Sequence, residues 1–256
     1  MRNLTIALIA YKNINLDWLK LLKKKLNARI VISFDEPENL DFTQFCDNYL
    51  INDSRLGFGK NRRMSMILAR ELGEYCMITD GDGQFPLNSL EIVKELLFQD
   101  KWEIIIPQRK NRNLKMKYQD KILNRLPFEQ FEAACAIKIL NNPNLTLDFD
   151  AQPGLYGFKS EITELILPED KNWLADFEIT LKAIRYATFR FADVEIDHSV
   201  QEITHFSIED QLKKLKRIAK CFNLDLTKVY HETQNLFPNF EKKIMKEILS
   251  KLNEND

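Results

Sequence analysis

Short apolar runs alternate with amphipathic segments along the first 110 residues. The apolar runs have the length of buried strands, and they cover residues 4–10, 29–34, 49–51, 75–78 and 102–107. Apolar residues at helical spacing predict helices between them, over 16–26, 42–46, 60–72 and 87–98. Strands that alternate with helices are typical of an α/β fold with a mostly parallel sheet and right-handed crossovers. Ligands of such sheets bind beyond the carboxyl ends of the strands.

The pattern loosens in the second half of the chain. Helices are predicted over 128–140 and 173–186, a turn that leads into a short strand over 152–158, and a strand over 189–196. From residue 207 onward the sequence is helical in pattern, with a last helix over 240–252. We therefore expect one compact α/β domain over residues 1–206, with helices flanking its sheet. A helical C-terminal extension over 207–256 would pack on that domain.

Composition narrows the possible partners and the compartment. Of the 256 residues 45% are hydrophobic, which is ample for a core, and the net charge of −1 gives no global basic field for nucleic acid. Local basic segments at 109–125 and 213–220 are interpreted as solvated faces; if functional, they would attract a phosphorylated or polyanionic acceptor. Four widely spaced cysteines without a CxxC pair indicate reduced thiols, an intracellular protein and no zinc site.

The chain carries no sign of membrane insertion. Residues 1–10 lead straight into a strand and lack the long apolar segment of a signal peptide. No run approaches the roughly 18–20 apolar residues that a spanning helix needs. We expect a cytoplasmic protein without an integral membrane segment, whose contact with any lipid is peripheral.

Two closely spaced acidic residues follow the apolar run at 75–78, in the sequence Asp80-Gly81-Asp82-Gly83. Two carboxylates one residue apart repel each other unless a cation lies near them. Their hard oxygen atoms suit Mg²⁺ or Mn²⁺, which keep open positions for phosphate oxygens. Glycine at position 81 allows close approach of another group. The sequence thus predicts a metal–diphosphate site at the end of a strand, and an ordinary Asp-Gly turn is the alternative.

Four other side chains are candidates for ligand binding, and two of them, Tyr11 and Asp35, fall at the same edge of the sheet. Tyr11 follows the first strand, where it could stack on a base or lie on the surface as an ordinary aromatic residue. Asp35 ends the second strand, where a turn or capping role is the alternative. Lys60 and Arg63 begin a helix after two glycines, a place that favours phosphate. Their alternative is a solvated basic face.

The order of these segments resembles that of GT-A glycosyltransferases of family 2, over about residues 4–198. The similarity is greatest over 56–86, where Gly-Phe-Gly-Lys-Asn-Arg-Arg leads into a helix and then into the Asp80-Gly81-Asp82 motif. The continuation into Gln84 and Pro86 is similar to enzymes that glycosylate polyprenyl phosphates. Residues 175–179 look like the Glu-Asp-x-Glu-Leu segment of the family, with Ala175 in place of the first Glu, and 152–158 look like its preceding strand.

The resemblance implies a role for each matching acidic residue. Asp80 would face the ribose and the metal, Asp82 would be the direct metal ligand, and Asp35 would hold the nucleoside. Asp176 would be the general base of an inverting transfer, with Glu178 next in line; the alternative for Asp176 is a helix N-cap.

Histidine supplies the remaining metal candidate. Several GT-A enzymes take a third metal ligand from a C-terminal histidine, and His198 is placed for this, in competition with His205. A structural or exposed histidine is the alternative. His231 has no assigned role.

The resemblance therefore implies a transferase that uses Mn²⁺ or Mg²⁺ and moves a sugar from a nucleotide diphosphate sugar to an acceptor. The acceptor stays open between a polyprenyl phosphate, a glycan and a hydroxylated base of phage DNA, since phage DNA-base glycosyltransferases resemble the Gly-Lys-Asn-Arg-Arg and Asp176 segments. A sugar-1-phosphate nucleotidyltransferase is one alternative, but it needs a glycine-rich loop after the first strand, and the first glycine of this chain is Gly57. A non-catalytic nucleotide-sugar-binding module is another. The sequence does not predict the oligomeric state.

Overall fold

The computed structural model describes residues 3–110, 112, 115–118, 121–170, 172, 174–197, 203–204 and 208–253. The chain divides into two compact units. Unit 1 comprises Met1–Asn111 and Gln152–Val200, and unit 2 comprises Arg112–Ala151 and Gln201–Asp256. The helices expected as a C-terminal extension thus share their unit with residues 112–151. The ion pair between Glu132 and Lys214 joins these two stretches. Both side chains are buried, and a buried charge needs a partner of opposite sign.

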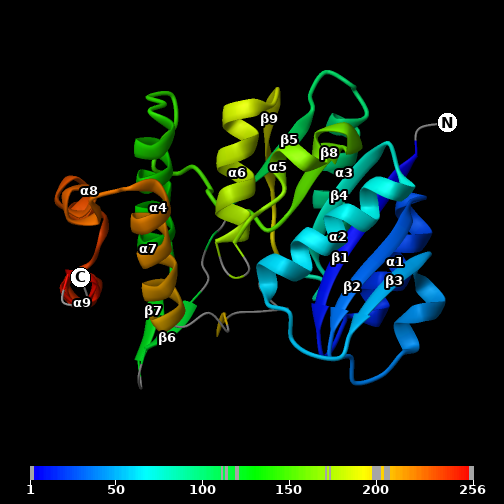
Figure 1. Ribbon diagram of the computed structural model, residues 1–256, viewed down its shortest axis with the longest axis horizontal. Coiled ribbons are helices and arrows are strands. Elements are labelled where there is room, and N and C mark those ends of the chain that lie inside the picture. Colours follow the sequence, from blue (N-terminus) through cyan, green and yellow to red (C-terminus); the bar gives the residue numbers. More distant parts are fainter. Residues whose placement is uncertain are drawn as a thin grey trace. The chain divides into compact units, whose positions relative to one another are not determined.

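Unit 1 is built on a seven-stranded sheet (Figure 1). Its strands are β1 (Leu4–Tyr11), β2 (Arg29–Asp35), β3 (Asn48–Asn52), β4 (Tyr75–Asp80), β5 (Ile104–Arg109), β8 (Tyr156–Lys159) and β9 (Phe189–Val194). The order across the sheet is β3-β2-β1-β4-β8-β5-β9, and only β8 runs antiparallel to its neighbours. The predicted fold class, a mostly parallel α/β sheet of Rossmann type flanked by helices, is confirmed.

Helices cover both faces of this sheet. One face carries α2 (Phe58–Leu72), α5 (Thr163–Ile166) and α6 (Ala175–Tyr186), and the other carries α1 (Leu16–Leu26) and α3 (Leu87–Leu97). Two short 3-10 helices, η1 (Asp41–Phe45) and η2 (Ser160–Ile162), complete the unit. Because side chains alternate along a strand, Tyr156 and Phe158 point toward α2 and α6, while a Cβ on Gly157 would meet Val93 of α3.

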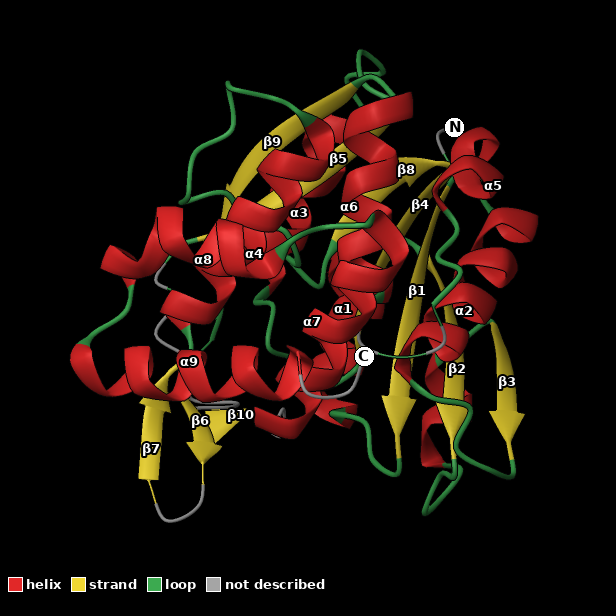
Figure 2. Cartoon of the chain, turned by 60° about the vertical axis from the view of Figure 1, so that its left-hand side comes forward, coloured by secondary structure: helices red, strands yellow, loops and turns green. Residues whose placement is uncertain are grey.

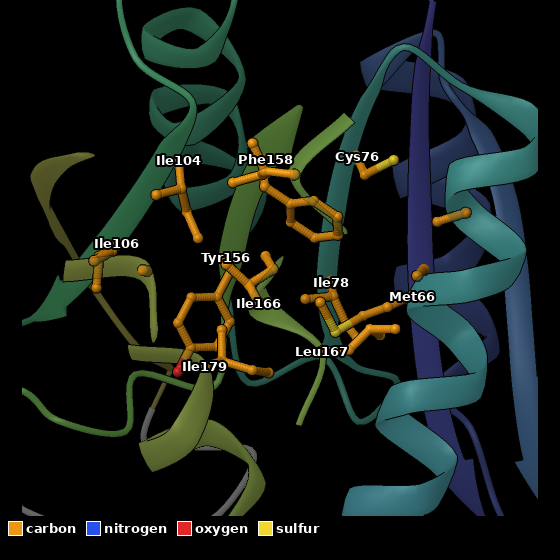
Figure 3. Close-up of a cluster of buried hydrophobic side chains, with 14 of the residues drawn as sticks. Met66, Cys76, Ile78, Ile104, Ile106, Tyr156, Phe158, Ile166, Leu167 and Ile179 are labelled. Carbon is orange, nitrogen blue, oxygen red and sulfur yellow. The ribbon is translucent and has the colours of Figure 1, made fainter. Parts of the chain in front are cut away.

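The core on the α2 and α6 side explains why the apolar runs of the sequence are continuous. Met66 of α2, Ile78 of β4, Ile104 of β5 and Ile179 of α6 are fully buried together (Figure 3). Strands that are covered on both faces read as apolar on both faces. The apolar middle of the sheet therefore fixes where each strand stops, and the polar residues that follow are collected at one edge.

Unit 2 combines a small sheet with helices (Figure 2). Its strands are β6 (Lys115–Tyr118), β7 (Lys121–Asn124) and β10 (Ile203–Thr204), and its helices are α4 (Leu126–Leu140), α7 (Ile208–Phe222), α8 (Leu226–Thr233), η3 (Gln234–Leu236) and α9 (Asn239–Asn253). The ring of Phe237 packs edge-on against Phe128 and Phe131 of α4. Within the described part of the chain, no helix has both the length and the apolar character required of a membrane span.

Candidate functional site

Tyr11, Asp35 and Asp80, which the sequence predicts at the carboxyl ends of strands, lie at one edge of the sheet. Tyr11 pairs in register with Asp35, and Asp35 with Asn52, so that β1, β2 and β3 end side by side. Asp80 ends β4, the other neighbour of β1. The carboxyl ends of these four parallel strands form the part of unit 1 where ligands of such sheets bind.

The loop after Asp80 is held tightly by the start of α1. Gly81 donates a backbone hydrogen bond to Ile9 (2.8 Å) and accepts one from Asn15 (3.0 Å), and the Asp82 carboxylate accepts one from the Gln84 amide (2.9 Å). A Cβ on Gly81 would lie 3.0 Å from the Ile14 side chain, so a larger residue fits only if Ile14 moves. The Asp-Gly-Asp-Gly sequence is therefore a fixed loop that presents two carboxylates.

Arg62 of α2 lies at the centre of the site and is fully buried. Its Nε and Nη2 atoms lie 2.8 and 3.1 Å from the two carboxylate oxygens of Asp176, although the Nε contact is poorly aligned as a hydrogen bond. The same Nη2 donates to Asp80 Oδ1 at 3.2 Å, and both terminal nitrogens donate to the Gly154 carbonyl. The guanidinium carbon also lies 4.7 Å from the centre of the Phe58 ring. One arginine thus joins α2, β4, α6 and the loop before β8.

The first turn of α6 carries Asp176, whose side chain is only 8% exposed. The N-cap of this helix is Leu174, so Asp176 is not the capping residue that the structural alternative required. The Tyr156 hydroxyl donates to the Asp176 carbonyl at 2.8 Å and lies 2.9 Å from the Thr180 hydroxyl. Arg62 and Tyr156 therefore hold the same turn, one through its carboxylate and the other through its backbone.

Two of the clustered carboxylates, Asp80 and Asp82, have raised pKa values. Burial raises the pKa of Asp80 to about 7, and the negative charges of Asp82 and Asp176 add to the rise, while Arg62 and Arg109 oppose it. Surrounding protein atoms also raise the pKa of Asp82, although this residue is exposed at the surface. Since a third of the Asp80 side chain (34%) remains exposed, water moderates these effects. The local excess of negative charge would be relieved by a bound cation.

This donor set fits a divalent ion that shares its coordination with a substrate. Asp80 and Asp82 offer hard carboxylate oxygens of the kind that Mg²⁺ and Mn²⁺ prefer. Among the residues that the structure describes, no group of three or more His, Cys, Asp or Glu side chains is arranged to hold a metal. Magnesium sites in which one or two carboxylates and substrate phosphates hold the ion have this composition.

Tyr11 and Asp35, two residues predicted to bind the nucleotide, lie next to each other at the ends of β1 and β2. Asp35 is buried, and its two carboxylate oxygens accept hydrogen bonds from the Asn52 side chain (2.9 Å) and the Leu56 amide (3.0 Å). Burial raises the pKa of Asp35 in spite of these bonds. Tyr11 is 41% exposed, and the guanidinium of Arg55 lies 4.5 Å from its ring centre. Asp35 thus anchors the loop that brings Arg55 onto Tyr11.

Lys60, Arg63 and Glu178 are the remaining candidates. Lys60 is exposed on the first turn of α2, and Arg63 donates to the Pro168 carbonyl at 3.1 Å. Glu178 accepts hydrogen bonds from the Glu169 and Asp170 amides, at 2.6 and 3.0 Å. In the structure Arg63 and Glu178 therefore fix the chain between α5 and α6.

His198, the predicted third metal ligand, lies outside the described residues, as do His205 and Trp173. The chain just before His198 is described. The Asp197 amide donates to the Gln84 carbonyl at 2.8 Å, so Asp197 lies beside the loop that carries Asp82.

The interpretation of the basic segments as solvated faces is wrong for Arg109, Arg112 and Lys214, which are buried. Arg109 acts electrostatically on Asp80 in unit 1. In unit 2 the other two contact acidic residues of α4: Arg112 lies 3.8 Å from Glu129, and Lys214 lies 2.5 Å from Glu132. These charges compensate buried carboxylates and are not available as an exposed patch.

Arg62 was missed among the sequence candidates, although the sequence contains a signal for it. In a helix over 58–72, Gly59, Arg62, Met66 and Ala69 follow one another at helical spacing on a single face, and all four are buried. An arginine on the apolar face of a helix needs a buried anionic partner. Lys60 and Arg63 lie on other faces, where a charge needs no such partner.

With this geometry established, the chain can be compared with known proteins. No protein-family model matches the sequence, and no curated protein matches it. Among solved structures, residues 1–349 of TarS from S. aureus align with 89% of this chain and 68% of that one, at 12% identity and a TM-score of 0.49. In a longer TarS structure the match spans 43% of that chain, at 13% identity and a TM-score of 0.49.

Two further solved structures are similar at this level. The 4-diphosphocytidyl-2C-methyl-D-erythritol synthase of Anaerococcus prevotii aligns over 83% of this chain and 96% of its own, at 12% identity and a TM-score of 0.44. CMP:2-keto-3-deoxy-manno-octonic acid synthetase in complex with CTP aligns over 75% and 90%, at 11% identity and a TM-score of 0.45. These similarities are too distant to bear on activity. The α/β fold class rests on the seven-stranded sheet described above.

Proposed function

We propose that the chain is a glycosyltransferase that moves a sugar from a nucleotide diphosphate sugar to an acceptor with the help of Mn²⁺ or Mg²⁺. One observation carries the proposal. Asp80, which ends β4, and Asp176, which begins α6, are 96 positions apart in the sequence and contact the same buried arginine. A carboxylate near the diphosphate and another near the acceptor are what a displacement at the sugar's anomeric carbon requires.

The proposed reaction is a single displacement with inversion. The acceptor hydroxyl oxygen forms a bond to the anomeric carbon, and the bond from that carbon to the diphosphate oxygen breaks. The bonding electrons leave with the nucleoside diphosphate, and the hydroxyl proton passes to the Asp176 carboxylate. Arg62 keeps its positive charge beside Asp176, since an arginine does not lose its proton in proteins. Each carboxylate oxygen retains a second lone pair that can accept this proton.

On the donor side, Asp80 and Asp82 would hold the divalent ion. Bound there, the ion would supply charge stabilisation for the leaving diphosphate. Tyr11 and Asp35 border the place where the nucleoside would lie, and Arg55 would have to leave the Tyr11 ring for a base to stack on that face. The absence of glycine between Tyr11 and Asn15 disfavours a nucleotidyltransferase, which needs a glycine-rich phosphate loop there.

The first test is a thermal-shift panel of UDP, GDP, ADP and CMP and their common sugar derivatives, each with and without Mn²⁺. A ligand at about a hundred times its dissociation constant stabilises the fold by roughly 2.7 kcal/mol, a readable shift. We expect one nucleotide to give a shift that requires Mn²⁺. If no nucleotide shifts the wild-type chain under either condition, the proposed function is wrong.

Two substitutions separate the roles of the carboxylates. Asp82→Asn should abolish the Mn²⁺-dependent shift in a folded protein, whereas Asp176→Asn should retain the shift and lose transfer. Asp17→Asn on α1, with a fully solvated side chain (91% exposed), is the matched control. Polyprenyl phosphate, an oligosaccharide and DNA with hydroxymethylated bases, each supplied with the donor that binds, then distinguish the three acceptor classes. Full transfer by Asp176→Asn would move the base elsewhere.

A further inference from the structure

We propose that Arg62 is the positioning residue of this site: it fixes the carboxylate of Asp176 next to Asp80, so that the donor side and the acceptor side keep one geometry. This inference rests on the proposed function. It goes beyond the function because it assigns the relative placement of the two carboxylates to a third side chain on another helix.

The contacts of Arg62 are those of a clamp. Its two contacts to Asp176, at 2.8 and 3.1 Å, fix the carboxylate in orientation as well as in distance. Its contact to Asp80 at 3.2 Å comes from the same Nη2 atom, so neither aspartate can shift without affecting the other. A planar fork of donors suits this arrangement, whereas the single ammonium of a lysine carries the charge without the geometry.

The surroundings of the guanidinium exclude solvent and hold it beside the two aspartates. The side chain is excluded from solvent, and its remaining hydrogen bonds go to the Gly154 carbonyl (3.4 and 3.3 Å). Gly154 has a positive φ of 78°, which turns this carbonyl at a point where L side chains are strained. Asp80 also remains partly exposed, while Arg62 and Asp176 do not, so a ligand at the surface would reach Asp80 before it reached the clamp.

The positioning role predicts a split between binding and turnover. Arg62→Lys retains the positive charge and loses the fork. Because a misplacement of about 1 Å can cost a hundredfold in rate, we expect kcat to fall about a hundredfold. The dissociation constant of the nucleotide should change by less than about threefold. Activity is followed as release of nucleoside diphosphate from UDP-glucose, GDP-mannose or ADP-glucose in Mn²⁺, with rates divided by the concentration of nucleotide-binding sites, so that loss of folded protein does not count.

Arg70→Lys is the matched control, since Arg70 lies at the far end of α2 and contacts Glu71 and Glu164 at the surface. It should change neither quantity. The variant Arg62→Lys/Asp176→Asn tests whether Arg62 acts through Asp176. If it does, adding Arg62→Lys to Asp176→Asn lowers the residual rate by less than about threefold.

Each result has a defined reading. An unchanged kcat in Arg62→Lys, or effects that multiply in the double variant, would overturn the proposal and leave the proposed function standing. A wild-type chain that binds no nucleotide would refute both. If Arg62→Lys does not fold, Tyr156→Phe loosens the same turn of α6 from its backbone side. Its kcat should then fall about tenfold with nucleotide binding retained, and an unchanged kcat would again overturn the proposal.

Discussion

Asp80 gives a prediction that depends on the electrostatics of the site and not on its ligands. Asp80→Asn should make the metal-free protein more stable at pH 8. In the folded protein the pKa of Asp80 is raised from 3.8 to about 7, mainly by burial. At about 1.4 kcal/mol per pKa unit this corresponds to roughly 4 kcal/mol. Because 34% of the Asp80 side chain is exposed, solvent screening lowers this free energy, and we expect Asp80→Asn to be more stable than the wild type by about 1–3 kcal/mol.

The sign of the pH dependence follows from proton uptake. With a folded-state pKa above the unfolded value of 3.8, the folded protein binds more protons than the unfolded chain between about pH 4 and pH 7. The contribution of Asp80 to stability is therefore fully present below pH 4 and is lost as the pH rises through about 7. Asparagine does not titrate, and its side-chain oxygen can still accept the hydrogen bond from Arg62. The advantage of the variant should thus grow from pH 5 to pH 8.

The assay is urea unfolding in EDTA at pH 5, 6, 7 and 8, with wild type, Asp80→Asn and the exposed control Asp17→Asn. The control should track the wild type at every pH. A variant that is less stable than the wild type at pH 8 would refute the reasoning, because the pair with Arg62 would then outweigh burial. A gap of equal size at pH 5 and pH 8 would refute it as well, because the gap would not come from titration.

Two further predictions concern packing and buried charge. Gly59→Ala should lower the free energy of unfolding by about 3 kcal/mol or more, since the new Cβ would lie 2.1 Å from the Asp170 carbonyl oxygen. Gly154→Ala has no contact under 3.6 Å and should lose only the roughly 1–2 kcal/mol that a positive φ costs. Equal urea midpoints for the two variants would contradict this. Glu132→Gln removes the carboxylate that buried Lys214 contacts and should cost about 3–5 kcal/mol, against less than about 1 kcal/mol for Glu232→Gln in the exposed pair with Lys138. A loss at Glu132 no larger than at Glu232 would contradict it.

The elements of unit 1 could be predicted from the sequence because its strands and helices are locally determined. The predicted helix over 16–26 is α1, and the other predicted strands and helices before residue 110 lie within a few residues of those observed. Buried strands read as apolar runs, and amphipathic helices read at helical spacing. The carboxylates at the strand ends followed from the same pattern, since a strand stops where its apolar run stops.

What the sequence could not provide depends on contacts between distant residues. The strands β6 and β7 have only four residues each, Lys-Met-Lys-Tyr and Lys-Ile-Leu-Asn, and runs this short are not distinguished from a loop by their pattern alone. The antiparallel direction of β8 is equally invisible along the chain. The role of Arg62 was hidden because its partners lie 18 and 114 positions away. A basic residue beside Lys60 and Arg63 looked like part of a solvated face.

Gly59, in the first turn of α2, connects packing to the geometry of the site. Gly59 brings the first turn of α2 against the backbone of Asp170 and Asn172. The carboxylate of Glu178 accepts hydrogen bonds from backbone amides of the same stretch. One helical turn later, Arg62 reaches Asp176 in the first turn of α6. The close approach at Gly59 therefore sets the distance across which the clamp operates. A methyl group there would push α2 away from this stretch, and the bidentate contact, with its dependence on orientation, would be disturbed before the hydrophobic packing deeper in the core.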